Sequence, residues 1–305
     1  MLNHAVVFPG QGSQSVGMLS DLAKRYPLVE TLFATVSERL GYDLWNLVQQ
    51  GPAEVLNQTA YTQVAMLTAD VVIYKLLEQQ SDFKPSIMAG HSLGEYAALV
   101  CAGALQLTDA AELVRRRGQL MQDNVPLGVG AMAAIVGLSD VQVKAICEQA
   151  SSATSKVEPA NYNAIGQVVI AGHTEGVNKA CMIAKEMDAR LATIIPVSVP
   201  CHCSLLSQAA EQFAEALSLA PFIVPSIPVI SNVDLSVYQS TEQIRSLLKQ
   251  QLYAPVRWVE TIQLIKQKNV ELILECGPGK VLSGLVKRID NSFQIEQASE
   301  LLLRG

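Results

Sequence analysis

Residues 87–99 have the sequence IMAGHSLGEYAAL, which contains the pattern G-x-S-x-G. The apolar run before Gly90 is typical of a short buried strand, and the residues after Gly94 are typical of a helix. In this context the two glycines allow Ser92 to occupy a sharp strand-to-helix turn that larger neighbours would obstruct. The stretch therefore predicts an α/β fold with Ser92 exposed as a nucleophile, and an ordinary tight turn is the alternative interpretation.

Short apolar runs alternate with longer helical patterns over the rest of the chain, which is typical of a parallel α/β sheet. Four runs are predicted to be buried strands: Ala5–Phe8, Ile87–Ala89, Val229–Ser231 and Leu272–Cys276. Six stretches are predicted to be helical: Ser20–Leu40, Thr62–Gln79, Tyr96–Ala102, Thr108–Asp123, Ser204–Leu217 and Thr241–Leu252.

Residues 128–198 have a different pattern from the segments around them. Strands are predicted at Ala131–Val136, Val157–Tyr162, Val168–Ala171 and Leu191–Val199, and helices at Ser139–Ala150 and Thr174–Met187. Ser139 and Thr174 are suitable N-cap residues for the two helices. The order β-α-β-β-α-β is typical of a ferredoxin-like unit. We therefore predict an inserted small subdomain at 128–198, a discontinuous large domain at 1–127 and 199–305, and a cleft between them.

The composition excludes several classes of protein. The chain has 305 residues, of which 16% are charged and 50% hydrophobic, with a net charge of −6. This composition is not that of a disordered chain, and the negative balance argues against a nucleic-acid partner. The uncharged stretch Leu191–Ala210 contains two prolines, so it does not predict a membrane-spanning helix. Residues 1–8 lack the features of a signal peptide, and we expect a cytoplasmic protein.

The six cysteines should be reduced in the cytoplasm. Cys201-His202-Cys203 resembles a set of metal ligands, but zinc pairs usually have two to four residues between them. Adjacent residues of an extended segment point to opposite faces, so small buried thiols are the simpler interpretation. We predict no metal site.

A serine nucleophile needs a base, and the chain has four histidines. His4 lies at the start of the first predicted strand, and the side chain of His91 should diverge from its neighbour on the sharp turn. His173 enters a helix of the insertion, whereas His202 lies where the chain returns to the large domain, at the predicted cleft. His202 is therefore the predicted base and His173 the alternative. Since no motif singles out an acid, we predict a Ser–His dyad in which a backbone carbonyl could hold Nδ1–H.

The loop after the first strand, Phe8-Pro9-Gly10-Gln11-Gly12-Ser13, is a candidate part of an oxyanion hole. Glycines on both sides of Gln11 would let its backbone N–H approach a ligand closely. The predicted hole consists of the N–H groups of Gln11 and Leu93, the latter at the helix N-terminus. A simple turn after the strand is the alternative.

Arg117 lies on the apolar face of the helix that Thr108 is expected to cap. The apolar stripe consists of Ala110, Leu113, Val114, Leu120 and Met121, and Arg117 falls within it at helical spacing. Arg115 and Arg116 fall outside the stripe and should be solvated. An inward guanidinium needs a negative partner, which is either an internal Asp or Glu or the free carboxylate of a substrate bound by two hydrogen bonds.

Taken together, these segments resemble the malonyl-CoA:acyl carrier protein transacylase family of fatty-acid synthesis. The matching segments follow the family order over nearly the whole chain: 8–14 (FPGQGSQ), 90–95 (GHSLGE), 117–118 (RG), 199–202 (VPCH), 251–253 (QLY) with 255–256 (PV), and 275–280 (ECGPGK). The resemblance implies an α/β-hydrolase-like large domain with a parallel sheet and an inserted ferredoxin-like subdomain.

The resemblance also implies roles for site residues. Ser92 would be the acylated nucleophile and His202 the base, with Gln11 and Leu93 as the oxyanion hole. Arg117 would bind the malonyl carboxylate, and the backbone carbonyl of Gln251 would orient the histidine. The family's loop asparagine corresponds to Asn161 or Asn163. The sequence departs from the family at Val64, which replaces a proline after Gln63, and at Cys201, where serine is frequent.

The implied reaction is a ping-pong transfer from malonyl-CoA to the phosphopantetheine thiol of acyl carrier protein, with no metal or redox cofactor. Lys280, Lys287 and Arg288 could contact the acidic carrier protein or could simply be a solvated face. Nothing in the sequence demands more than a monomer. A serine hydrolase and a non-enzymatic scaffold are the competing hypotheses, and an inward Arg117 argues against a hydrolase of neutral acyl chains.

Overall fold

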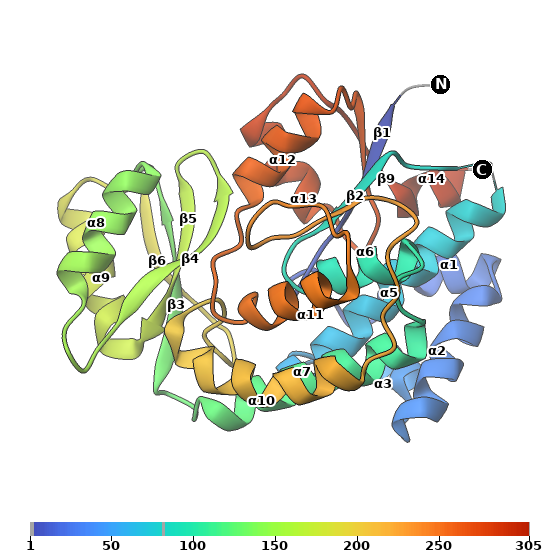
Figure 1. Cartoon of the computed structure of the whole chain (residues 1–305), viewed down its shortest axis with the longest axis horizontal. Helices are drawn as coiled ribbons and strands as arrows, with labels where there is room; N and C mark the ends of the chain where they lie inside the picture. Colours follow the sequence, from blue (N-terminus) through green and yellow to red (C-terminus); the bar gives the residue numbers. More distant parts are fainter. Residues whose placement is uncertain (1–2, 81–82, 305) are drawn as a thin grey trace.

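The computed structural model describes residues 3–80 and 83–304, which form two β-sheets surrounded by helices (Figure 1). Met1 and Leu2, part of the N-terminus expected to lack a signal peptide, lie outside the described residues. The described strands are β1 (His4–Phe8), β2 (Ile87–Gly90), β3 (Gly130–Val136), β4 (Val157–Ala164), β5 (Gln167–His173), β6 (Leu191–Ile195), β7 (Val229–Ile230), β8 (Leu272–Glu275) and β9 (Gln294–Gln297).

The described helices surround these strands, and none of them is long and apolar enough to cross a bilayer. The helices are α1 (Ser20–Arg25), α2 (Leu28–Leu40), α3 (Leu44–Gln50), α4 (Ala53–Leu56), α5 (Thr59–Gln80), α6 (Gly94–Cys101), α7 (Leu107–Asn124), α8 (Asp140–Ala150), α9 (Thr174–Glu186), α10 (Ser207–Leu219), α11 (Thr241–Gln250), α12 (Trp258–Gln267), α13 (Val281–Ile289) and α14 (Ala298–Arg304), with a 3-10 turn η1 at Ser204–Leu206.

The larger sheet is parallel, with the strand order β7-β2-β1-β8-β9. Both of its faces are covered, because alternate residues of β1 pack into different apolar clusters. Val6 and Phe8 belong to the cluster formed with α5 and α6. Ala5 and Val7 belong to the cluster formed with α12 and α13. This arrangement explains why the strands are continuous apolar runs, and it confirms the predicted α/β class.

The smaller sheet is antiparallel, with the order β4-β5-β3-β6, and lies at one end of the molecule (Figure 1). Its strands and the helices α8 and α9 follow the predicted β-α-β-β-α-β order. The two helices pack against one face of the sheet. The other face contains Met132, Val169 and Ala171, which pack with Cys203 of the segment that returns to the parallel sheet. The boundaries proposed at residues 128 and 198 stay a prediction.

Hydrogen bonds join β4 of the smaller sheet to segments of the rest of the chain. The N–H of Val256, just before α12, donates to the carbonyl of Ala160 in β4, and the Val256 carbonyl accepts from the N–H of Tyr162; both N···O distances are 2.9 Å. The side chain of Glu158 accepts from the N–H of Ser204 at 2.7 Å. The β4 edge of the smaller sheet is therefore fixed beside the parallel sheet.

Two elements are predicted too long, because in the structure a proline interrupts each of them. The predicted helix Ser20–Leu40 is two helices, since Pro27 favours an extended conformation at Tyr26, where φ is −126° and ψ is 103°. The predicted strand Leu191–Val199 ends at Ile195, immediately before Pro196, which has no N–H for the ladder.

Of the three predicted N-caps, only Ser139 is confirmed. It forms a capping box with Gln142. Helix α7 begins one residue earlier than predicted, so Gln106 rather than Thr108 is its N-cap. Thr174 is the first residue of α9 instead of its cap, and its hydroxyl donates to the carbonyl of Gly128 at 2.7 Å.

Candidate active site

The G-x-S-x-G turn connects β2 directly to α6. Ser92 has a φ of +52°, a left-handed conformation that is uncommon for a residue with a side chain. A methyl group added to Gly90 would lie 1.8 Å from the carbonyl carbon of Gly94, and one added to Gly94 would lie 2.1 Å from the carbonyl oxygen of Phe8. Both glycines are therefore required by the close approach of the backbones, and the turn holds Ser92 at the carboxyl ends of β1 and β2.

His202 is hydrogen-bonded to Ser92, with 2.7 Å between Nε2 and Oγ. On its other side, Nδ1 lies 2.7 Å from the main-chain oxygen of Gln251. Because a carbonyl oxygen can only accept, Nδ1 carries the proton and Nε2 is left as an acceptor for the Ser92 hydroxyl. The N–H of His202 donates to the carbonyl of Leu252 at 3.0 Å, so two successive carbonyls at the end of α11 hold this residue.

His202 is 3% exposed, and this burial lowers its pKa from 6.5 to about 3. The positive charge of Arg117 also lowers the pKa, while the hydrogen bond to the Gln251 carbonyl raises it. The imidazole is therefore neutral at physiological pH, which is the state that a general base requires.

The other three histidines do not contact the Ser92 hydroxyl. Nε2 of His91 lies 2.8 Å from Oδ1 of Asn163, which comes from β4. His173 accepts a hydrogen bond from the N–H of Lys156 within the smaller sheet. His4 lies in β1 and stacks on the ring of Phe83. Of the two candidate bases, His202 is the one that the structure brings to Ser92.

The predicted oxyanion donors lie where the loop after β1 meets the turn. The N–H of Ser92 donates to the side chain of Asn232 at 2.7 Å and is not available to a ligand. The N–H groups of Gln11 and Leu93 have no acceptor among the residues described. A methyl group on Gly10 would lie 2.6 Å from the His91 oxygen and 3.7 Å from the Leu93 nitrogen, so the two backbones are in contact. The loop that carries the Gln11 N–H therefore lies against the turn that carries the Leu93 N–H.

Arg117 is buried, with 1% of its surface exposed. Its Nη1 donates to the amide oxygen of Gln63 at 2.9 Å, and its Nη2 donates to that of Gln251 at 3.1 Å. The guanidinium also lies 5.6 Å from the ring centre of Tyr96. It forms no ion pair with any carboxylate in residues 3–80 and 83–304, which argues against the internal Asp or Glu. The buried positive charge is held by neutral groups beside the Ser–His pair.

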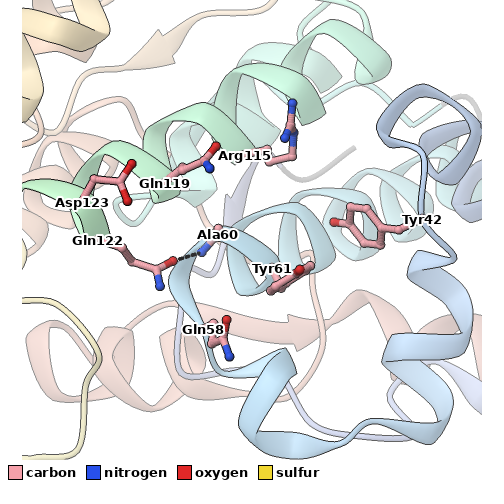
Figure 2. A pocket seen from close by; sticks show the side chains of 8 residues that line it. All are labelled: Tyr42, Gln58, Ala60, Tyr61, Arg115, Gln119, Gln122 and Asp123. Carbon is pink, nitrogen blue, oxygen red and sulfur yellow. Dashed lines mark hydrogen bonds between the residues drawn. The ribbon is translucent and has the colours of Figure 1, made fainter. Parts of the chain in front are cut away.

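A pocket of about 300 Å³ lies on the side of α7 that faces away from Arg117 (Figure 2). Arg115, Gln119 and Gln122 of α7 line it together with Tyr42 and residues at the start of α5. Arg115 is two residues from Arg117 and therefore points to the opposite side of the helix. It is half-buried rather than fully solvated as expected, and Arg116 is exposed. This pocket does not contain the Ser–His pair.

Sequence reasoning missed three polar residues that support the site. Glu95, Asn232 and Tyr238 are buried and connected, because Glu95 accepts from the N–H of Asn232 and from the Tyr238 hydroxyl. The signal for Glu95 was a carboxylate within the otherwise apolar helix GEYAALVC. Asn232 follows β7 at the sheet edge where α/β sites form, which was a weaker signal.

The Cys201-His202-Cys203 segment does not form a ligand cluster. Cys203 packs in the apolar cluster of the smaller sheet, while Cys201 directs its Sγ towards the carbonyl of Val199. The described parts of the chain contain no group of three or more His, Cys, Asp or Glu residues that could hold a metal ion.

Comparison with known families gives one match over most of the chain: the acyl transferase domain family matches residues 5–298. The malonyl CoA-acyl carrier protein transacylase of Escherichia coli K12 is 50% identical over 300 residues, which cover 98% of this chain and 97% of that protein. The protein of the same name from Bacillus subtilis is 40% identical and covers 97% of this chain and 93% of its own length.

Solved structures share the fold. The malonyl CoA-acyl carrier protein transacylase of Coxiella burnetii has a TM-score of 0.97 and 48% identity, covering 99% of this chain and 96% of that one. A malonyl-transacylase solved in complex with a type II polyketide acyl carrier protein has a TM-score of 0.96 and 47% identity, covering 99% of this chain and 100% of that one.

Proposed function

The chain belongs to the acyl transferase family, and from this premise we propose that it is a malonyl-CoA:acyl carrier protein S-malonyltransferase of fatty-acid biosynthesis. The observation that carries the substrate assignment is Arg117. This buried cation has only neutral hydrogen-bond partners among the described residues, and one of them, Gln251, also bonds to Ser92 and His202. A free carboxylate at the end of the acyl group would supply the missing negative charge.

In the first half-reaction, the Ser92 hydroxyl gives its proton to Nε2 of His202 and attacks the thioester carbon of malonyl-CoA. The oxyanion of the tetrahedral intermediate accepts from the N–H groups of Gln11 and Leu93. As the intermediate collapses, the carbon–sulfur bond breaks, and His202 returns the proton to the CoA sulfur. Malonyl-Ser92 and free CoA result.

In the second half-reaction, His202 takes the proton of the phosphopantetheine thiol of acyl carrier protein. The thiolate attacks the Ser92 ester, and the same two N–H groups hold the second oxyanion. The proton returns to Ser92 Oγ when the ester bond breaks, so the enzyme is regenerated. Throughout both steps the carbonyl of Gln251 holds Nδ1–H, and Arg117 holds the malonyl carboxylate.

The proposed chemistry needs a nucleophile, a base and oxyanion donors, and the chain supplies them from its own residues without a metal or redox cofactor. We also retain the expectation of a cytoplasmic monomer that acts on malonyl-CoA and acyl carrier protein, with no nucleic-acid partner. Lys280, Lys287 and Arg288 are all exposed, so an acidic carrier protein could reach them.

The test is a panel of acyl-CoA donors, with and without acyl carrier protein, followed by intact-mass measurement. We expect malonyl-CoA to add one malonyl group to the wild-type enzyme and none to Ser92→Ala, and the carrier protein to remove it as malonyl-carrier. Labelling of Ser92→Ala would disprove the nucleophile assignment. Release of free malonate at the same rate with and without carrier would identify a hydrolase instead.

A further inference from the structure

The side chain of Gln251 lies at the centre of the site and makes three hydrogen bonds. Its Oε1 accepts from Arg117, and its Nε2 donates to the main-chain oxygen of Ser92 at 3.0 Å and to Oε2 of Glu95 at 2.7 Å. The main-chain oxygen of the same residue accepts from His202. One residue therefore contacts both the predicted base and the predicted carboxylate-binding group, and any shift of Gln251 would disturb both.

Glu95 is the residue that holds the Gln251 amide from the side away from Arg117. It is fully buried, and its Oε1 accepts from the hydroxyl of Tyr238. Its Oε2 accepts from the N–H of Asn232 at 3.2 Å in addition to the amide of Gln251. The carboxyl group forms no ion pair in the described residues. It shares the Gln251 amide with Arg117, whose positive charge also lowers the pKa of Glu95. Its bonds thus go to neutral donors.

The orientation of the Gln251 amide follows from these partners. Arg117 can only donate, so it requires the amide oxygen, and the Ser92 carbonyl can only accept, so it requires the amide nitrogen. Glu95 adds a second acceptor on the nitrogen side, and the Ser92 carbonyl alone would leave one of the two N–H groups unbonded. With all three partners the amide has one orientation in which every bond is formed.

We propose that Glu95 is a positioning residue that anchors the Gln251 amide, and through it sets the places of Arg117 and His202. The proposal rests on the proposed function in one respect, that Arg117 binds the acyl carboxylate. Glu95 itself contacts neither the substrate nor the reacting atoms. Its role is to accept a hydrogen bond at a fixed point, so that Gln251 presents its oxygen to Arg117 and its carbonyl to His202.

A purely electrostatic role for Glu95 would predict the opposite change in the preference for malonate when Glu95 is removed. If the carboxylate acted only by its negative charge near Arg117, its removal would strengthen the attraction between Arg117 and malonate. If it acts as an anchor, its removal should weaken the preference for malonate. The ratio of the Ser92 acylation rates with malonyl-CoA and acetyl-CoA distinguishes the two roles, and this ratio does not depend on the fraction of enzyme that is folded.

The experiment compares two variants of similar size in the full chain. Glu95→Leu removes the acceptor, and we expect the malonyl/acetyl ratio to fall about ten- to hundredfold, as for the loss of a hydrogen bond to a charged group. Glu95→Gln keeps an oxygen that can accept from Gln251, so the ratio should stay within about threefold of wild type. A folded Glu95→Leu with an unchanged or raised ratio would overturn the proposal, as would a Glu95→Gln that falls as far as Glu95→Leu.

The matched control is Glu275→Gln. Glu275 is also fully buried, but it accepts from the N–H groups of Leu282 and Ser283 and from the Ser283 hydroxyl, all at the start of α13. We expect a lower melting temperature and an unchanged ratio. A changed ratio would mean that loss of any buried carboxylate alters selectivity, which would contradict a specific positioning role for Glu95.

If Glu95→Leu does not fold, Tyr238→Phe decides the question. This variant removes one donor from Glu95 and lets its carboxyl group rotate, so the ratio should fall about two- to fivefold. An unchanged ratio in a folded Tyr238→Phe would overturn the anchor.

The same samples separate this proposal from the proposed function. If the wild-type enzyme forms no malonyl-Ser92, the proposed function has failed. The anchor is then judged by the rate at which a fluorophosphonate labels Ser92, which requires His202 but no particular acyl donor. We expect slower labelling in Glu95→Leu, and labelling at the wild-type rate would overturn the proposal.

Discussion

Arg117 shows how the environment of a residue can mark it as a functional candidate. A buried guanidinium is usually paired with a carboxylate, whereas this one is bonded to the amides of Gln63 and Gln251. Neutral amides satisfy its N–H groups without cancelling its charge. Because its Nε is also buried without a partner among the described residues, the guanidinium still has a donor to offer. Its charge and this donor are the features that an anionic ligand requires.

We expect Arg117→Ala to lose malonyl transfer by a factor on the order of a hundred or more. Two charge-assisted hydrogen bonds, at about 1.5–3 kcal/mol each, would be lost. Acetyl transfer should be kept or increased, because an acetyl group has no carboxylate. Single-turnover acylation of Ser92 with the two donors measures both effects. Arg116→Ala, which removes an exposed arginine next in the sequence, is the control, and equal selectivity in the two variants would contradict the role of Arg117.

The pH dependence of Ser92 acylation should reflect the low pKa of His202. Burial and the charge of Arg117 both lower this pKa. The acid limb of the pH–rate profile, where the rate falls as His202 becomes protonated, should therefore lie well below pH 6.5. In Arg117→Gln one of these causes is removed, so the pKa of His202 should rise and the loss of activity on the acid side should begin at higher pH. Labelling by a neutral fluorophosphonate in short pulses between about pH 2.5 and 8 measures the shift. If the limb has the same midpoint in both proteins, the guanidinium does not influence the base.

At this scale the sequence could predict Ser92, His202 and Arg117 as candidates. Ser92 and Arg117 carry local signals, and His202 was selected among four histidines by its place at the predicted cleft. For Ser92 the signal is the glycine pattern, and for Arg117 it is a charge within an apolar stripe. The connected group of Glu95, Asn232 and Tyr238 could not be predicted as a unit. Its members are up to 143 residues apart in the chain, and only the fold brings them into hydrogen-bonding contact.

At the scale of elements, Gly118 determines how closely α7 approaches α5. A methyl group on Gly118 would lie 2.7 Å from the Cα of Ala60 and 2.9 Å from its nitrogen, and both are backbone atoms that cannot rotate away. The close approach also brings Arg117 to Gln63. The glycine of the Arg117-Gly118 pair therefore has a packing role that its helix propensity alone would not suggest.

We expect Gly118→Ala to lower the free energy of unfolding by about 1–3 kcal/mol, as overpacking usually does. The malonyl/acetyl ratio should also fall, since α7 would move away from Gln63. Gly284→Ala in α13 is the matched control, because nothing lies within 4 Å of the added methyl group. This variant should be stabilised by up to about 1 kcal/mol, the usual difference between glycine and alanine in a helix. Equal melting temperatures for the two variants would contradict the packing role.

The elements that the sequence could not predict have weak local signals. Strand β9, Gln294–Gln297, contains one apolar residue, because it is an edge strand that pairs only with β8. Helix α13 contains Gly284 in its middle, which reduces its helix propensity. The central strands were predictable because both of their faces are buried, and the first helix was predicted too long because its amphipathic pattern continues across Pro27.

At the scale of the whole molecule, the site depends on contacts between the two sheets. His91, beside the nucleophile, is bonded to Asn163 of β4, and β4 is bonded through its backbone to Val256. The sequence could predict one parallel sheet and one ferredoxin-like unit, but it could not predict how the two fit against each other. That fit depends on the irregular pairing of β4 with β5, which shows register shifts on both sides of Asn161–Tyr162.

We therefore expect the two sheets to unfold together. Scanning calorimetry should show a single transition with equal calorimetric and van't Hoff enthalpies, because the small sheet shares an apolar cluster and several hydrogen bonds with the rest of the chain. Two resolved transitions, the smaller one assignable to residues 128–198 by limited proteolysis, would show instead that this segment is an independent unit.

The carbonyl that holds His202 has a consequence for the competition between thiol and water. An imidazole whose partner is a neutral carbonyl gains less from becoming charged than one beside a carboxylate, so it is a weak acceptor of protons. A thiol, with a pKa of about 8.5, releases its proton readily, whereas water, a far weaker acid, does not. We expect the ester on Ser92 to persist for many turnover times when no thiol is present, and its decay can be followed by intact mass. Because a thiol gives its proton to this imidazole far more readily than water does, the acyl group on Ser92 should wait for a thiol acceptor instead of being hydrolysed.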